Sequence, residues 1–147
     1  MISKTITYDD LNGNEVSKKL YFNLSKFDLA KMDVEYEDEV FTYTNEAGEE
    51  VTVNGTEAVI RDIMAKPKGK KILAFIENLV QKSYGERVDD EQFRKSPEIL
   101  NSFMATDAYG ALILGFVNNT EEFSEFMQGI IPKKLKEEAA KLKVEGF

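Results

Sequence analysis

The side chains that could do chemistry in this sequence are carboxylates, lysines, tyrosines and serines, because the chain contains neither cysteine nor histidine. Histidine is the usual general base near neutral pH, and cysteine and histidine are the commonest zinc ligands. Their absence excludes thiol nucleophiles, disulfides and sulfur-ligated metal sites. We therefore expect no catalytic, cofactor-binding or metal-ligating residue, and a protein that is not an enzyme.

Two acidic patterns have spacings worth comparing with calcium sites. Asp10, Asn12 and Asn14 stand at every second position, as in a calcium-binding loop. However, Glu15 occupies the place where such a loop needs glycine. In residues 33–39, an extended backbone would spread the carboxylates along one side instead of converging them on an ion. We expect a hairpin turn at the first pattern and a solvated face at the second.

Residues 66–71 contain four lysines around Gly69. They lack the glycine-rich pattern that holds phosphates, and no aromatic residue that could stack on bases follows until Phe75. An exposed loop between helices is the expected structure, and a docking site for an acidic segment is the alternative. The region around Tyr84, Arg87 and residues 89–91 combines basic and acidic groups, but it is too polar to predict a buried acid–base pair.

The chain has 147 residues and a formal net charge of −8, from 27 acidic and 19 basic side chains. A negative field repels nucleic acid, so a basic or apolar protein segment is the expected partner. The N-terminus has no apolar run long enough for a signal peptide or membrane span. We expect no membrane association, a cytoplasmic location and a single domain spanning 1–147.

The first part of the chain, residues 1–55, is predicted to be rich in β-structure. Residues 2–8 alternate apolar and polar side chains, an Asn-Gly turn follows, and residues 15–22 form the return strand. The following short helix, residues 26–32, is capped by Asn23 or Ser25 and turns Phe27 and Ala30 or Met32 towards the sheet. Residues 40–44 and 50–53 predict a second hairpin.

The second part, residues 56–147, has helical periodicity. We expect helices that begin at the following places: Thr56, the segment after Gly69, Ser96-Pro97, Thr106-Asp107, Asn119 or Thr120, and Pro132. The second of these helices should end near Tyr84-Gly85, with Gly85 in the left-handed conformation of a helix cap. Residues 86–95 should then form a loop. Gly129 should end the fifth helix. The fold class is α+β: one or two N-terminal β-hairpins followed by a bundle of four to six short helices.

The apolar residues of this helical part allow two interpretations. Stripes at helical spacing usually form a core. Some of them could instead line a groove for an amphipathic helix, for which methionine supplies adaptability. The candidate partner-binding residues are Met104, Phe116, Phe123, Phe126 and Met127.

Three stretches, in order and spacing, resemble the tail assembly chaperones encoded by phages of Gram-positive bacteria. The first contains Lys4-Thr5-Ile6-Thr7-Tyr8, a Leu-Asn-Gly turn and Leu20-Tyr21-Phe22-Asn23-Leu24-Ser25-Lys26. The second contains Tyr84-Gly85-Glu86-Arg87 and Phe93-Arg94-Lys95-Ser96-Pro97-Glu98. The third runs from Phe103-Met104-Ala105-Thr106-Asp107-Ala108-Tyr109 to Phe126-Met127-Gln128-Gly129-Ile130-Ile131-Pro132. Residues 35–55 are not part of the recognised pattern.

The resemblance implies a non-catalytic protein that binds the phage tape-measure protein and helps to recruit tail-tube subunits. It also implies a protein that needs no cofactor, acts in the host cytoplasm and is absent from the mature virion. The alternative is a structural virion component, such as a tail-tube or head–tail connector subunit. Tube subunits need sheets that pack into rings, so the helical second half of the chain favours the chaperone.

Overall fold

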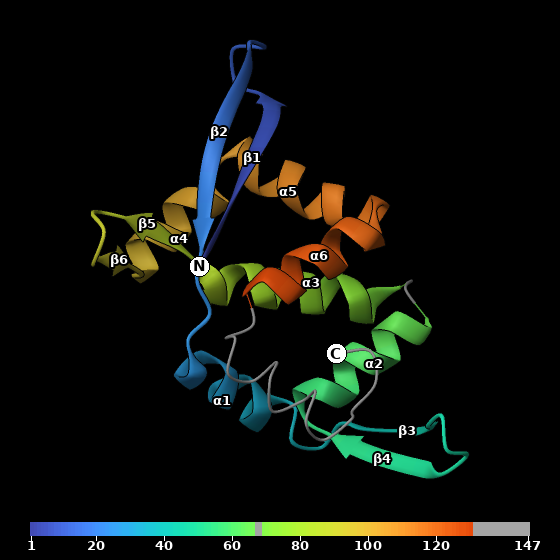
Figure 1. The fold of residues 1–147 in the computed structure, drawn as a ribbon. Coiled ribbons are helices and arrows are strands. Elements are labelled where there is room, and N and C mark those ends of the chain that lie inside the picture. Colours follow the sequence, from blue (N-terminus) through green and yellow to red (C-terminus); the bar gives the residue numbers. More distant parts are fainter. Residues whose placement is uncertain (67–68, 131–147) are drawn as a thin grey trace. The chain divides into compact units, whose positions relative to one another are not determined.

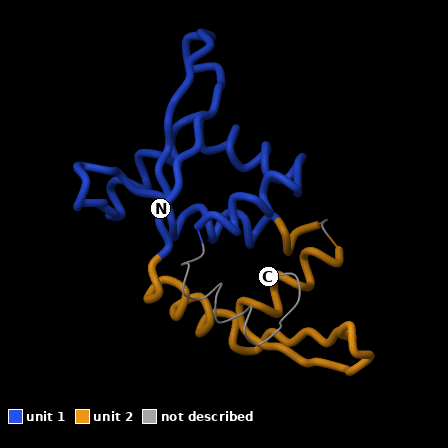
Figure 2. Tube along the Cα trace, viewed as in Figure 1, with its two compact units in different colours: residues 1–24, 73–130 blue, residues 25–72, 131–147 orange. Residues whose placement is uncertain are grey.

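The computed structural model describes residues 1–66 and 69–130, which form two compact units (Figure 2). Unit 1 comprises residues 1–24 and 73–130, and the described part of unit 2 comprises residues 25–72 except 67–68. Each unit contains a β-hairpin and helices, so their boundaries do not follow the expected division at residue 55. The single domain stays a prediction. The α+β fold class is confirmed, with β-hairpins and six helices in the described residues (Figure 1).

Unit 1 is built on a long hairpin whose strands are β1 (Ile2–Asp9) and β2 (Glu15–Phe22). The strands pair antiparallel along their full length, from Ile2 opposite Phe22 to Asp9 opposite Glu15. In the turn, Asp10 Oδ1 accepts hydrogen bonds from the backbone N–H groups of Asn12 and Asn14, both at 2.9 Å. The every-second-residue pattern of Asp10, Asn12 and Asn14 therefore serves the turn, as predicted.

Two short strands extend this sheet, β5 (Tyr84–Arg87) and β6 (Phe93–Arg94), in the order β1-β2-β5-β6. The preceding helix ends at Ser83, next to the expected position, but the expected glycine cap at Gly85 is wrong. The expected loop at 86–95 is also wrong where residues 86–87 and 93–94 form strands. Gly85 has no positive φ and lies opposite Tyr21. Glycine is needed there because an added Cβ would lie 2.6 Å from the Arg94 carbonyl oxygen and 2.7 Å from the Phe93 ring.

Four helices complete unit 1: α3 (Lys70–Ser83, from Leu73 onward), α4 (Pro97–Met104), α5 (Asp107–Asn118) and α6 (Thr120–Ile130). The start of α4 is as predicted, because the Ser96 side chain accepts a hydrogen bond from the Ile99 N–H at 3.1 Å and Pro97 opens the helix. Asn119 Oδ1 caps α6 through the Glu122 N–H. Helix α6 continues past Gly129 to Ile130, and the expected last helix at 133–143 lies outside the described residues.

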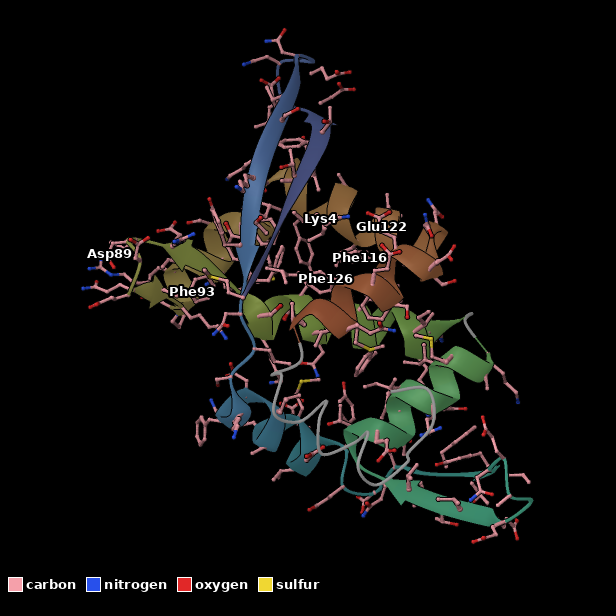
Figure 3. The ribbon with its side chains drawn as sticks, in the orientation of Figure 1. Lys4, Asp89, Phe93, Phe116, Glu122 and Phe126 are labelled. Carbon is pink, nitrogen blue, oxygen red and sulfur yellow. The ribbon has the colours of Figure 1, made fainter. Side chains whose placement is uncertain are left out.

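The core of unit 1 lies between the hairpin and its helices. Phe22 of β2 meets Phe126 of α6 edge to face with ring centroids 5.0 Å apart, and Phe126 lies 4.8 Å from Phe116. Figure 3 shows Phe116 and Phe126 in this interior, with Lys4 and Glu122 forming an ion pair beside them. Lys4 also lies over the Phe116 ring, 5.3 Å from its centroid.

Unit 2 contains α1 (Lys26–Glu35), the predicted second hairpin of β3 (Val40–Thr44) and β4 (Glu50–Asn54), and α2 (Thr56–Ala65). A reciprocal capping box between Ser25 and Asp28 begins α1. Helix α2 is capped from α1, because Asp33 Oδ1 accepts a hydrogen bond from the Thr56 N–H at 3.1 Å. Gly55, with φ +74°, is its N-cap residue.

The burial of side chains in unit 2 only partly follows the inward face predicted for the helix at residues 26–32. Met32, Val59, Ile60 and Ile63 are buried, but Phe27 is 68% exposed and is not a core residue. Lys31, one turn further along α1, places its ammonium 4.5 Å from the Phe27 ring centroid. A cation–π contact of this kind stabilises an aromatic ring that stays exposed at the surface.

None of the described helices is individually long and apolar enough to cross a membrane. Helices α4 and α5 together have a suitable length and composition, but they are bent by 76° at the break between them.

Candidate functional site

The five candidate partner-binding residues do not form one surface. Phe116, Phe123, Phe126 and Met127 are buried in unit 1, where Phe116 and Phe123 have ring centroids 5.4 Å apart. Met104, at the end of α4, is partly exposed. The stripe of aromatic residues is thus core in this structure, and a role of these five residues in partner binding stays a prediction.

Met104 lies in an open groove of about 580 Å³ in unit 1, which we call the α5 groove. It is formed by the last residues of β1, the end of α4 and the first half of α5. Its lining residues are Thr7, Tyr8, Asp9, Met104, Thr106, Asp107, Tyr109, Gly110, Ala111 and Leu114. The groove brings together segments almost one hundred residues apart in the chain.

The groove is apolar because α5 carries apolar residues on two sides. Its sequence, DAYGALILGFVN, contains a single charged residue, Asp107. Leu112, Ile113 and Phe116 are buried, whereas Leu114, on the opposite side, is 61% exposed. Helices that are apolar all round are normally buried all round. The outer side of α5 therefore has the composition of a contact surface.

Tyr109 forms one wall of the groove and is held in place by α3. Its hydroxyl donates a hydrogen bond to Glu77 Oε1 at 2.8 Å and accepts one from Gln81 Nε2 at 3.0 Å. Its ring packs edge to face on Phe103, with centroids 5.5 Å apart. Burial raises the pKa of Tyr109, the hydrogen bond from Gln81 lowers it, and the hydrogen bond to Glu77 raises it further.

The charged residues that line the groove are both acidic. Asp9 ends β1 and Asp107 begins α5, and both are exposed. No basic residue is among those that line the groove. The groove therefore combines exposed apolar surface with two carboxylates.

The other candidate sites have structural roles in the described residues. Asp33 and Glu35 lie in α1, so the extended backbone expected for residues 33–39 is wrong. The expected solvated face is confirmed, because Asp33, Glu35, Glu37 and Asp38 are exposed. Lys71, from the lysine cluster, pairs with Asp62 Oδ2 at 2.7 Å and with Glu39 Oε2 at 3.1 Å. The hydrogen bonds to Asp62 and then Glu39 raise the pKa of Lys71. Within residues 1–66 and 69–130, no group of three or more acidic residues could hold a metal ion.

The region around Tyr84 is also structural. The Tyr84 ring stacks on Phe103 with centroids 3.9 Å apart, and burial raises the pKa of Tyr84. Asp89 closes the β5–β6 turn by accepting hydrogen bonds from two backbone N–H groups, and Figure 3 places it at the tip of this small hairpin, with Phe93 further back on β6. Arg87 pairs with Asp90 Oδ1 at 2.9 Å, so the basic and acidic groups of this region form an exposed ion pair.

Sequence reasoning missed Leu114, Tyr109 and Asp9 as surface residues of one groove. Leu114 could have been noticed, because it lies about 200° around the helix from Phe116, at 100° per residue. The sequence of α5 therefore already shows that the helix is apolar on both sides. The contribution of β1 was not visible, since it depends on tertiary packing.

Comparison with protein families agrees with the resemblance seen in the sequence. A family model described as phage tail assembly chaperone matches residues 1–145, which includes the segment 35–55 that lay outside the recognised pattern. Searches of curated proteins and of solved structures gave no match. The chain belongs to the phage tail assembly chaperone family.

Proposed function

We propose that this tail assembly chaperone binds the tape-measure protein of its phage and helps to recruit tail-tube subunits. It acts without catalysis, in the cytoplasm of a Gram-positive host, and leaves before the virion is complete. The observation that carries the proposal is the exposed apolar side of α5 in a member of this family. Covering the apolar surface of a long helical protein requires such a contact surface and no reactive group.

The net charge of −8 supports the same function. An acidic, charged exterior keeps a complex dispersed and disfavours phosphate backbones. A chaperone of this kind would therefore hold an aggregation-prone partner in solution without being drawn to the phage genome.

Co-expression with overlapping fragments of the tape-measure protein of the same phage tests this proposal. We expect at least one fragment to be insoluble alone and to co-purify with the chaperone in a single peak in size-exclusion chromatography. A small acidic domain of unrelated fold is the control for a general solubilising effect. If every fragment stays insoluble or elutes separately, tape-measure binding is wrong.

Virion composition separates the chaperone from a structural tail component. Quantitative mass spectrometry of purified phage should find the chaperone far below the tail-tube subunit. A copy number comparable to that of a tube or connector subunit would contradict the proposal. Tube recruitment is tested by adding tail-tube protein to the purified complex, where a ternary complex is expected.

A further inference from the structure

The α5 groove has the features of a docking site for a helix. We propose that it binds the apolar face of one α-helix of the tape-measure protein, with a lysine or arginine of that helix next to Asp9 and Asp107. This inference rests on the proposed function and adds to it the site and the chemistry that selects the bound segment.

The shape of the groove allows another helix to approach closely. Gly110 and Ala111 have little or no side chain, and a Cβ added at Gly110 would meet no atom within 4 Å. Small residues on one helix let the side chains of another helix pack between its ridges. Leu114 lies one turn after Gly110, and Met104 comes from α4. Leucine and methionine suit an apolar partner because both present large side chains without polar atoms that need hydrogen bonds.

The exposure of Leu114 supports the binding of an apolar partner at this groove. Leu114 is 61% exposed, and α5 carries no charged residue after Asp107. A solvated helix face normally carries charged and polar side chains. The hairpin shows this behaviour where the exposed residues Thr5 and Lys19 lie opposite each other.

The charges at the groove define the partner further. Asp107 also compensates the positive end of the α5 dipole, so Asp9 carries more of the unbalanced negative charge. A basic side chain at the matching end of the bound helix would neutralise it and fix the direction of the helix. An acidic or phosphate-bearing partner would be repelled.

The groove is also formed in advance. The hydrogen bonds of Tyr109 with Glu77 and Gln81, and its edge-to-face contact with Phe103, fix the wall that it forms. A preformed surface loses less conformational entropy on binding than one that must first become ordered. Leu114 can therefore contact the bound helix without prior ordering of the groove.

Substitution at Leu114 tests the site, with the tape-measure fragment that binds wild-type chaperone as the probe. Leu114→Glu places a third acidic group in the groove and should weaken binding at least about tenfold, the loss expected at a central interface residue. Val88→Glu is the matched control, because Val88 is also an exposed apolar residue of unit 1 but does not line the groove. It should bind like wild type. Circular dichroism and unfolding midpoints verify that both variants fold.

The charge is tested by Asp9→Asn combined with Asp107→Asn. This variant should bind more weakly at low salt and should lose part of the salt dependence of wild-type affinity. Affinity and salt dependence equal to wild type would overturn the charge assignment.

Crosslinking identifies the bound segment directly. The chain has no cysteine, so Leu114→Cys introduces a single thiol. A short thiol-to-amine crosslinker at this position should capture a tape-measure peptide with apolar residues at helical spacing and a nearby lysine, whereas Val88→Cys should not.

The outcomes separate the two proposals. If wild type binds no fragment, both are wrong. If wild type binds a fragment and Leu114→Glu binds it equally well, the site is wrong and the proposed function stands. A crosslink from Leu114→Cys to a second copy of the chaperone would also overturn the site, because the groove would then be a contact between copies.

Discussion

Leu114 and Phe116 lie two residues apart on α5, yet Leu114 is 61% exposed and Phe116 is completely buried. Phe116 packs against Phe123 and Phe126 and lies beneath the Lys4 ammonium. The two residues therefore divide α5 into a buried side and an exposed side. This division leads to the first prediction.

Phe116→Ala should destabilise the chain by about 3–5 kcal/mol, because it leaves a cavity among buried rings. Leu114→Ala should change the free energy of unfolding by no more than about 0.5 kcal/mol, since the side chain is mostly in solvent. Urea unfolding followed by circular dichroism measures both values. Similar losses for the two variants would contradict the division of α5 into a buried and an exposed side.

Glycine substitutions test the packing of β5 against β6. Gly85→Ala should cost about 1–3 kcal/mol, because the new Cβ would overlap the Arg94 carbonyl oxygen and the Phe93 ring. Gly115→Ala, in α5, meets no atom within 4 Å and should stabilise the helix by about 0.5–1 kcal/mol. Thermal unfolding midpoints should move in opposite directions. A Gly85→Ala variant as stable as wild type would show that the two strands do not approach so closely.

The cap of α4 can be tested with two serines of the same region. Ser96→Ala removes the hydrogen bond to the Ile99 N–H and should cost about 1 kcal/mol. Ser102→Ala, within the same helix and exposed, is the control and should be neutral or slightly stabilising, since alanine is the better helix former. Equal stability of Ser96→Ala and wild type would argue against this cap.

Tyr84, which is buried, and Tyr109, which is partly buried, predict how stability depends on alkaline pH. Burial raises the pKa of both Tyr84 and Tyr109 in the folded chain above the ordinary value near 10. The unfolded chain therefore releases these protons first as the pH rises, and stability should fall from about pH 10 through the folded pKa values. Below about pH 10, the contribution of these two phenols to the free energy of unfolding is fully present.

Titration of the phenolate absorbance in the folded chain provides the measurement. Tyr84→Phe and Tyr109→Phe should each remove one late-titrating tyrosine and reduce the steepness of the stability loss. Tyr8→Phe is the control, because it changes a partly exposed tyrosine on β1. If Tyr84→Phe and Tyr109→Phe leave the alkaline profile unchanged, the burial of these phenols is wrong.

The sequence by itself determined the secondary-structure elements that depend only on residues close together in the chain. Alternation in residues 2–8 and 15–22, together with the Asn-Gly turn, specified the first hairpin, and Ser96-Pro97 specified the start of α4. These signals are local, because side-chain alternation and capping hydrogen bonds involve residues within a few positions of one another. The ordered motifs across the chain also identified its family, which the family model confirms.

Only the tertiary structure decided which apolar residues are buried and where the groove lies. Residues 84–87 and 93–94 became strands because β2 offers its edge to Tyr84 and Gly85, a pairing of residues about sixty positions apart. Helix α5 is apolar on two sides, so its sequence does not say which side forms the core. Packing against β1 and α6 buries Phe116 and leaves Leu114 exposed. The physical reason is that burial depends on which surfaces meet in space, and periodicity within one helix carries no information about its neighbours.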